Sequence, residues 1–135
     1  MESEVHQLLV KSLVHWIEQH VHDASNAAVF CELPIEGGGN KPPLIGGFTP
    51  DMLCKVVGTQ GLWIGEAKTA GDLDTQHSRE QFKAFLGHLA QNGSGTLVIA
   101  VPWRVVRYAK SLIRLIQRQS GTSAVEVVYL DQLPG

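Results

Sequence analysis

Cysteine is scarce in this sequence, which has only Cys31 and Cys54 among 135 residues. Neither shows the spacing of a zinc site, and this argues against a fold that depends on structural zinc. Both fall within apolar segments, so they are expected to be reduced side chains in or near the core. A disulfide between them is the less favoured alternative.

Long hydrophobic runs are also missing. No apolar segment approaches the roughly 20 residues that span a bilayer, and the opening Met-Glu-Ser-Glu lacks the basic and then apolar pattern of a signal peptide. We therefore expect a cytoplasmic protein with no membrane partner. No low-complexity tract or convincing repeat is present, and the length suits a single domain over residues 1–135.

A large excess of charge of either sign is absent, since 11 basic and 13 acidic residues give a net charge of −2. This balance does not indicate nucleic-acid binding by itself, so such binding has to depend on a local cluster of basic residues. Hydrophobic residues make up 44% of the chain and charged residues 18%, as in ordinary folded domains.

The spacing of the apolar residues predicts an α/β fold. Apolar residues recur at helical spacing from Val5 to Val21, which predicts an amphipathic helix over residues 3–22. Residues 96–101 (TLVIAV) are almost uniformly apolar, as in a strand buried on both faces, and the helix expected before them completes a right-handed parallel βαβ unit. The full expected order is α-β-β-β-α-β-α-β, a mixed sheet flanked by helices. The other elements are strands at 26–33, 52–57, 62–68 and 125–130, a helix from near Thr75 to near Asn92, and a helix at 103–119.

Residues 52–68 read as a β-hairpin, because the glycines of the connection at 58–61 supply the backbone freedom of a turn. Asp51 opens the first strand, and Glu66 and Lys68 close the second. If the first and last residues of the connection pair, Asp51 lies opposite Lys68 and Leu53 opposite Glu66, so the three charged side chains share one face. A slip of one residue would move Asp51 to the other face.

Two carboxylates that converge at a strand end repel each other unless a cation lies between them. The cluster holds no Cys or His, and oxygen ligands favour Mg²⁺ or Mn²⁺ over zinc. The ammonium group of Lys68 would add a second positive charge beside the metal. In phosphodiester hydrolysis a metal polarises the phosphate and activates a water, while a neighbouring cation orients that water or stabilises the transition state.

The spacing of Pro50-Asp51 and then Glu66-Ala67-Lys68 on the next strand resembles the signature of the PD-(D/E)xK nuclease superfamily, which has the restriction-endonuclease-like fold. The resemblance covers roughly residues 3–101, over which that superfamily has the order α-β-β-β-α-β. It implies that Asp51 and Glu66 ligate the metal with help from the carbonyl of Ala67. It also implies that Lys68 acts on the attacking water.

Two more positions match the superfamily. Small members such as Holliday-junction resolvases often carry an acid early in the first helix and a glutamine in the helix after the second motif, and Glu4 and Gln81 occupy those places. The resemblance implies that they position metal, water or phosphate. An acid in a first turn is also favoured by the helix dipole alone, and Glu18 is the alternative to Glu4. Gln81 borders the apolar face beside Phe82, where a partly buried amide needs a partner.

Structural alternatives exist for the charged residues. Asp51, Glu66 and Lys68 could form a cross-strand ion cluster of purely structural value. Asp72 and Asp74 could approach a second metal, although acids before a helix are usually caps. The histidines are scattered along the chain, and none is assigned to a metal.

Five basic residues recur every three or four positions in the last expected helix, which keeps them on one helix face. They form either an ordinary solvated surface or a stripe that contacts the phosphates of a nucleic acid. The five basic residues, here called the basic stripe, are Arg104, Arg107, Lys110, Arg114 and Arg118.

The Gly- and Pro-rich loop at 37–47 is either a flap beside the site or a long connection.

These patterns predict a Mg²⁺-dependent nuclease that acts on DNA. The alternative from another class is a catalytically inactive module that keeps the nuclease fold and binds nucleic acid or a protein partner. A small-molecule enzyme is disfavoured, because the chain has no glycine-rich phosphate loop after a strand and no nucleophile paired with a base. Since one such site cuts one strand, a homodimer is expected.

Overall fold

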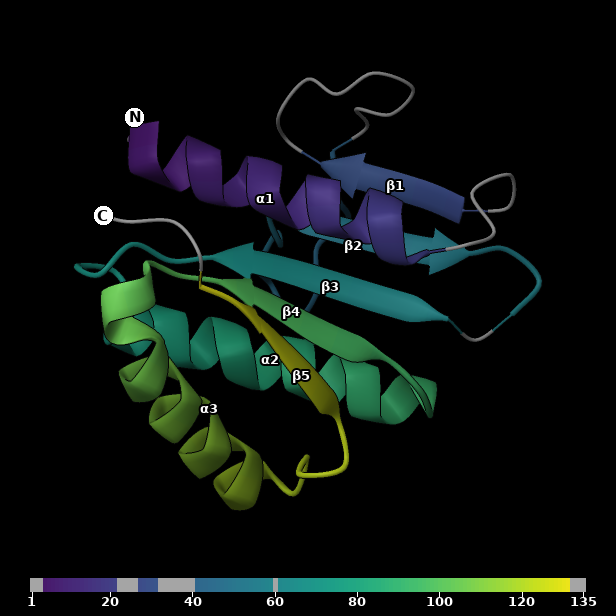
Figure 1. Ribbon diagram of the computed structural model, residues 1–135. Helices are drawn as coiled ribbons and strands as arrows, with labels where there is room; N and C mark the ends of the chain where they lie inside the picture. The colour runs from purple at the N-terminus through teal and green to yellow at the C-terminus, as the bar shows by residue number, and fades with distance from the viewer. Residues whose placement is uncertain (1–3, 22–26, 32–40, 60, 132–135) are drawn as a thin grey trace.

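The computed structural model describes residues 4–21, 27–31, 41–59 and 61–131. It is an α/β structure with a five-stranded mixed sheet in the order β1-β2-β3-β4-β5 and three α-helices (Figure 1). β1, β2 and β3 pair antiparallel, and β4 and β5 continue the sheet in parallel with β3. The elements are α1 (Glu4–His20), β1 (Ala27–Cys31), β2 (Met52–Val56), β3 (Leu62–Ala67), α2 (Gln76–Asn92), β4 (Thr96–Ala100), a short 3-10 turn η2 (Trp103–Val105), α3 (Val106–Ser120) and β5 (Glu126–Leu130).

The α/β class, the mixed sheet and the flanking helices confirm the prediction from apolar spacing. α2 begins and ends where its capping residues predict: the Thr75 side chain accepts a hydrogen bond from the backbone N–H of Ser78, and Gly93 ends the helix in the left-handed region. The predicted helix over 103–119 is divided, because the N–H of Val105 bonds to Pro102 in a 3-10 turn before α3 starts. Residues 3 and 22 of the expected first helix, and residues 26 and 32–33 of the expected first strand, lie outside the described residues.

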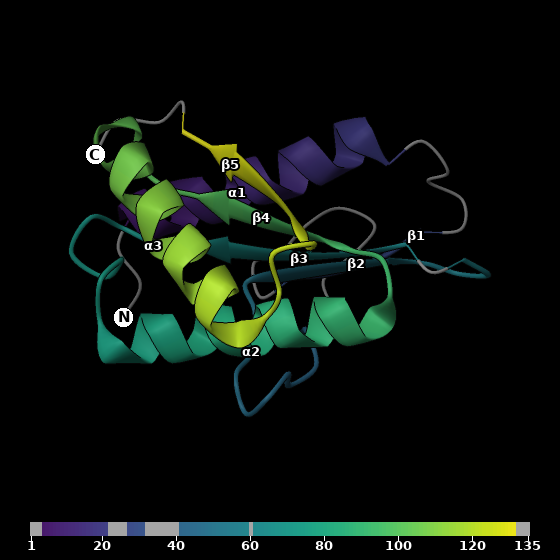
Figure 2. The same cartoon turned by 90° about the horizontal axis from the view of Figure 1, so that it is seen from below.

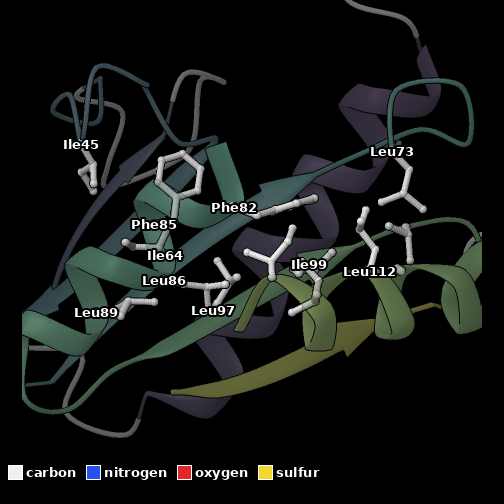
Figure 3. Packing of buried hydrophobic residues seen from close by; sticks show 14 of the residues in the cluster. Ile45, Ile64, Leu73, Phe82, Phe85, Leu86, Leu89, Leu97, Ile99 and Leu112 are labelled. Atoms are coloured by element: carbon white, nitrogen blue, oxygen red, sulfur yellow. The ribbon is translucent and has the colours of Figure 1, made fainter. Parts of the chain in front are cut away.

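The sheet separates two hydrophobic clusters, with α1 on one face and α2 and α3 on the other (Figure 2). β4 alternates between them: Leu97 and Ile99 join the cluster under α2 and α3, whereas Val98 and Ala100 join the cluster under α1. β4 is therefore buried on both faces, as its uniformly apolar sequence predicts. Figure 3 shows the packing of the α2 and α3 side, where Phe82, Phe85, Leu86 and Leu89 of α2 meet the strands.

Cys31 and Cys54 are both thiols outside any disulfide, buried on the α1 side of the sheet, in agreement with their expected role as reduced core residues. Burial raises the pKa of the Cys54 thiol to about 11.

Of the loop at 37–47, residues 37–40 lie outside the described ranges. In the described part, Ile45 is buried in the core and Gly46 packs closely on Ala84 of α2, so this segment is anchored to the helix.

The predicted hairpin is present, but its assumed register is wrong. Met52 pairs with Gly65 and Lys55 with Leu62, so Asp51 lies across from Glu66 and not from Lys68. The cause is a longer loop between Val56 and Gly61. The Thr59 hydroxyl bonds to the Val56 carbonyl at 3.1 Å and accepts the N–H of Gly61 at 3.0 Å, which closes the loop two residues earlier on the first strand. Because the shift is two residues, the alternation of faces is preserved.

Candidate active site

Asp51 and Glu66 hold each other in place at the open end of the hairpin. The backbone N–H of Asp51 donates to Glu66 Oε1 at 3.1 Å, and the N–H of Ala67 donates to Asp51 Oδ2 at 2.9 Å. Each carboxylate thus accepts a hydrogen bond from the backbone of the opposite strand. The two acids that the sequence places 15 residues apart are fixed side by side by the strand pairing itself.

Lys68 completes a chain of buried polar groups. Its Nζ lies 3.3 Å from Glu66 Oε2 and also donates a hydrogen bond to Gln81 Oε1, which reaches it from α2. The backbone N–H of Lys68 donates to the carbonyl of Ala100 at 3.0 Å, so the residue is tied to the end of β4. Glu66, Lys68 and Gln81 are exposed by only 3%, 7% and 8%. The partner that a partly buried Gln81 requires is therefore Lys68.

Burial perturbs the ionisation of Glu66. Its pKa is raised to about 8, first by burial and then by the nearby charge of Asp51, while the ammonium of Lys68 acts in the opposite direction. With both acids ionised, these three groups carry a net charge of −1. A further positive charge beside the two carboxylates would offset their repulsion and favour the ionised form of Glu66.

α1 contributes His6, which the sequence pattern did not single out. Its Nε2 lies 3.4 Å from Asp51 Oδ2, and the His6 side chain is only 17% exposed. The expectation that the cluster holds no His is therefore wrong, because α1 lies over this end of the hairpin. In the sequence, His6 resembles the other scattered histidines. The sequence feature that could have identified it is its position in the first turns of a helix that has to cover the sheet, three residues before the buried Leu9 and four before the buried Val10.

The donor set suits a hard divalent cation. Within the described ranges, no three His, Cys, Asp or Glu side chains are close enough together to hold a metal ion by themselves. Mg²⁺ does not need such a group, because it keeps several waters and often takes only one or two protein carboxylates. The paired oxygens of Asp51 and Glu66 and their excess negative charge fit that requirement.

Glu4 and Glu18 are both exposed on α1. Among the residues that the structure describes, no hydrogen bond or ion pair links either Glu4 or its alternative Glu18 to the cluster of Asp51, Glu66 and Lys68, so Glu18 is not assigned to the site. His6 is the residue through which the start of α1 contacts the cluster. The proposed role of Glu4 therefore has no contact to support it.

Asp72 and Asp74 contribute to the connection before α2. The Asp72 carboxylate accepts from the Thr69 hydroxyl, and Asp74 pairs with Arg79 at 2.6 Å and accepts from the hydroxyl of Tyr108. These contacts favour the structural alternative for both acids over a second metal. His20 stacks on Trp16 with ring centroids 4.2 Å apart, and His22 lies outside the described residues.

The basic stripe is spread over η2 and α3. Arg104, Arg107, Arg114 and Arg118 are exposed, while Lys110 is half-buried with its Nζ 5.5 Å from the centroid of the Tyr129 ring. α3 starts at the end of the sheet where β3 and β4 finish, which is the end that carries the acidic pair (Figure 1). Arg104 and Arg107 are thus the members of the stripe that follow most closely in sequence after the end of β4, which adjoins the candidate site.

Comparison of the chain with protein-family models, with curated proteins and with solved structures found no match. No helix in the described part of the chain is long and apolar enough to cross a membrane. The function is therefore inferred from the geometry and chemistry of the residues themselves.

Proposed function

We propose that the chain is a Mg²⁺- or Mn²⁺-dependent nuclease of the PD-(D/E)xK type, with a restriction-endonuclease-like fold, and that it hydrolyses phosphodiester bonds in DNA. The observation that carries the proposal is the pairing of Asp51 with Glu66 at adjoining strand ends, with the Lys68 ammonium 3.3 Å from Glu66. In such an arrangement the two carboxylates can hold a metal ion, and the ammonium can stabilise charge that develops on a phosphodiester during hydrolysis.

Each residue of the cluster has a separate task in this proposal. Asp51 and Glu66 hold the cation, together with the carbonyl of Ala67. When bound, the cation polarises the phosphate and lowers the pKa of a bound water. Lys68 orients the attacking water or stabilises charge that develops on the phosphate in the transition state. Gln81 fixes the Lys68 ammonium through the hydrogen bond that it accepts.

The basic stripe supplies the contacts to the substrate. The chain as a whole is slightly acidic, so phosphate binding has to be local. Arg104, Arg107, Arg114 and Arg118 are exposed residues of η2 and α3, and Lys110 lies between them. A homodimer would bring two such sites to the two strands of a duplex.

A catalytically inactive binding module is the second candidate, and one observation favours it. Both oxygens of the Glu66 carboxylate have partners within the protein, the N–H of Asp51 and the ammonium of Lys68. A cluster that is satisfied in this way also suits a structural ion network on a sheet.

Incubation with nucleic acids distinguishes the two candidates. Supercoiled, linear, single-stranded and branched DNA and RNA would each be incubated with Mg²⁺, with Mn²⁺ and with a chelator. We expect cleavage that needs the cation and that is lost in Glu66→Gln, with Glu18→Gln as a control that removes an exposed acid. Binding without cleavage under every condition would favour the inactive module.

A further inference from the structure

Trp103 is an exposed aromatic side chain close to the candidate site. It is 57% exposed and opens η2, three residues after Ala100, the residue whose carbonyl accepts the N–H of Lys68. Three residues span at most about 11 Å, so the backbone of Trp103 lies within that distance of the end of β4. Ala100 itself pairs with Ala67 on β3. Trp103 therefore stands at the end of the sheet that carries the acidic pair, with its side chain exposed.

An exposed large side chain is not unusual by itself. What distinguishes Trp103 is its surroundings. Arg104 follows it directly, and Arg107 comes one helical turn later, both exposed at the end of the sheet where α3 begins. Aromatic faces next to guanidinium groups are the combination by which proteins bind single nucleic-acid strands, since bases stack on the rings and phosphates pair with the cations.

We propose that Trp103 is a stacking platform for an unpaired base and that Arg104 and Arg107 contact the phosphates of the same single strand. The proposal rests on the proposed action on nucleic acid and narrows its substrate to single-stranded DNA or to a single-stranded segment of a larger DNA. Bases inside a duplex present only their edges to a protein, and stacking on one of them requires the duplex to be unstacked at a cost of a few kcal/mol. An exposed stacking platform at this end of the sheet thus favours strands whose bases are already free.

Binding of a labelled thymidine oligonucleotide, measured by anisotropy in chelator so that nothing is cut, tests the proposal. Trp103→Ala should weaken binding roughly 5-fold or more, the scale of one lost stacking contact, and Trp103→Phe should restore most of it. On an oligonucleotide of equal length made of abasic sites, which has the same phosphates but no bases, Trp103→Ala should bind like the wild type. Leu115→Ala removes another exposed apolar side chain, 39% exposed on α3, and should change neither affinity.

The salt dependence gives an independent readout. Trp103→Ala should leave the slope of log affinity against log salt unchanged, because a stacked base releases no counterion, whereas Arg107→Ala should reduce it by about 0.7 on a single strand. Equal loss on the thymidine and abasic strands, no loss on either, or an equal loss in Leu115→Ala would each overturn the proposal.

Parallel cleavage assays with Mg²⁺ and Mn²⁺ separate this proposal from the proposed function. A wild type that cuts DNA while Trp103→Ala binds thymidine strands normally would refute the stacking platform alone. A wild type that binds thymidine strands through Trp103 but cuts no nucleic acid would refute the nuclease and leave a single-strand-binding surface.

Discussion

Glu66 is a carboxylate that the fold buries between a second carboxylate and an ammonium group. Its backbone position in β3 and the hydrogen bond that it accepts from the N–H of Asp51 hold it there. Burial favours the neutral acid and Lys68 favours the anion, and burial together with Asp51 prevails, since the pKa is raised to about 8. The charge of this residue therefore contributes to the stability of the metal-free protein and to its affinity for a cation.

Stability without metal should fall as the pH rises from the ordinary pKa of a glutamate towards the raised pKa of Glu66. The pKa is about 8 in the folded protein and has the ordinary value of 4.5 when unfolded, so between these values the folded protein keeps a proton that the unfolded chain has lost. The free energy of unfolding then decreases by up to about 5 kcal/mol from pH 4.5 to pH 8 on account of this group. Glu66→Gln should lack this decrease.

Urea unfolding of the wild type and of Glu66→Gln in chelator, at several pH values from 5 to 8, measures the difference. The exposed Glu18→Gln serves as control and should follow the wild type. Free energies of the wild type and of Glu66→Gln that change in parallel with pH would contradict the buried, raised pKa of Glu66.

Lys68 should separate chemistry from metal binding. A charged ammonium has no lone pair for a metal, so its proposed work lies in the transition state. Lys68→Ala should lose cleavage by roughly 100-fold or more while the stabilisation by Mn²⁺ remains. Glu66→Ala should lose both. Cleavage rates and Mn²⁺-induced melting shifts would be measured on the same two variants, with the exposed Lys55→Ala as control. Cleavage by Lys68→Ala at the wild-type rate would show that the lysine is a purely structural partner of Glu66.

At the scale of elements, the strands supply the acidic pair and the helices supply its neighbours. α1 brings His6 to Asp51, α2 brings Gln81 to Lys68, and η2 and α3 carry the basic stripe from the same end of the sheet. The Tyr108 hydroxyl bonds to Asp74, which links the start of α3 to the segment before α2. Because Asp74 also pairs with Arg79 of α2, the first turn of α3 is joined to the helix that carries Gln81.

If the basic stripe binds DNA, it should contribute to the slope of log affinity against log salt concentration. If Arg107 and Arg114 contact phosphates, changing both to Ala should weaken binding to all sequences alike and reduce the salt slope by about 0.9 per lost contact on duplex DNA. The matched control is Lys55→Ala with Lys83→Ala, which removes the same charge from β2 and α2 at exposed positions. Equal slopes for the two double variants would make α3 an ordinary solvated surface.

At the scale of the whole molecule, metal binding and folding are coupled. Asp51 and Glu66 come together only through the pairing of β2 with β3, so the unfolded chain offers no comparable site. A cation at about 100 times its dissociation constant should therefore raise the free energy of unfolding by roughly 2.7 kcal/mol.

Thermal melting with and without millimolar Mn²⁺ measures this stabilisation. Because the cation needs ionised carboxylates, the shift should grow as the pH rises towards and above 8, where Glu66 loses its proton in the metal-free protein. Asp51→Asn should melt at the same temperature with and without Mn²⁺, and an equal shift in this variant and the wild type would show that the cation binds elsewhere.

The amino-acid sequence by itself determined the α/β class and the residue types at the open end of the hairpin. Apolar periodicity reports which face of each element is buried, and this is a local property that needs no knowledge of neighbours. The alternation of a strand likewise kept Asp51, Glu66 and Lys68 on one face although the assumed register was two residues out.

Only the tertiary structure decided which residues of the site contact each other. The register depended on the Thr59 hydroxyl, which closes a longer loop, and no periodicity encodes that bond. The choice of His6 over Glu4 beside Asp51 and the pairing of Gln81 with Lys68 depend on how two helices lie against the sheet. The raised pKa of Glu66 follows from the same packing, because burial and the distance between charges exist only once segments remote in sequence have come together.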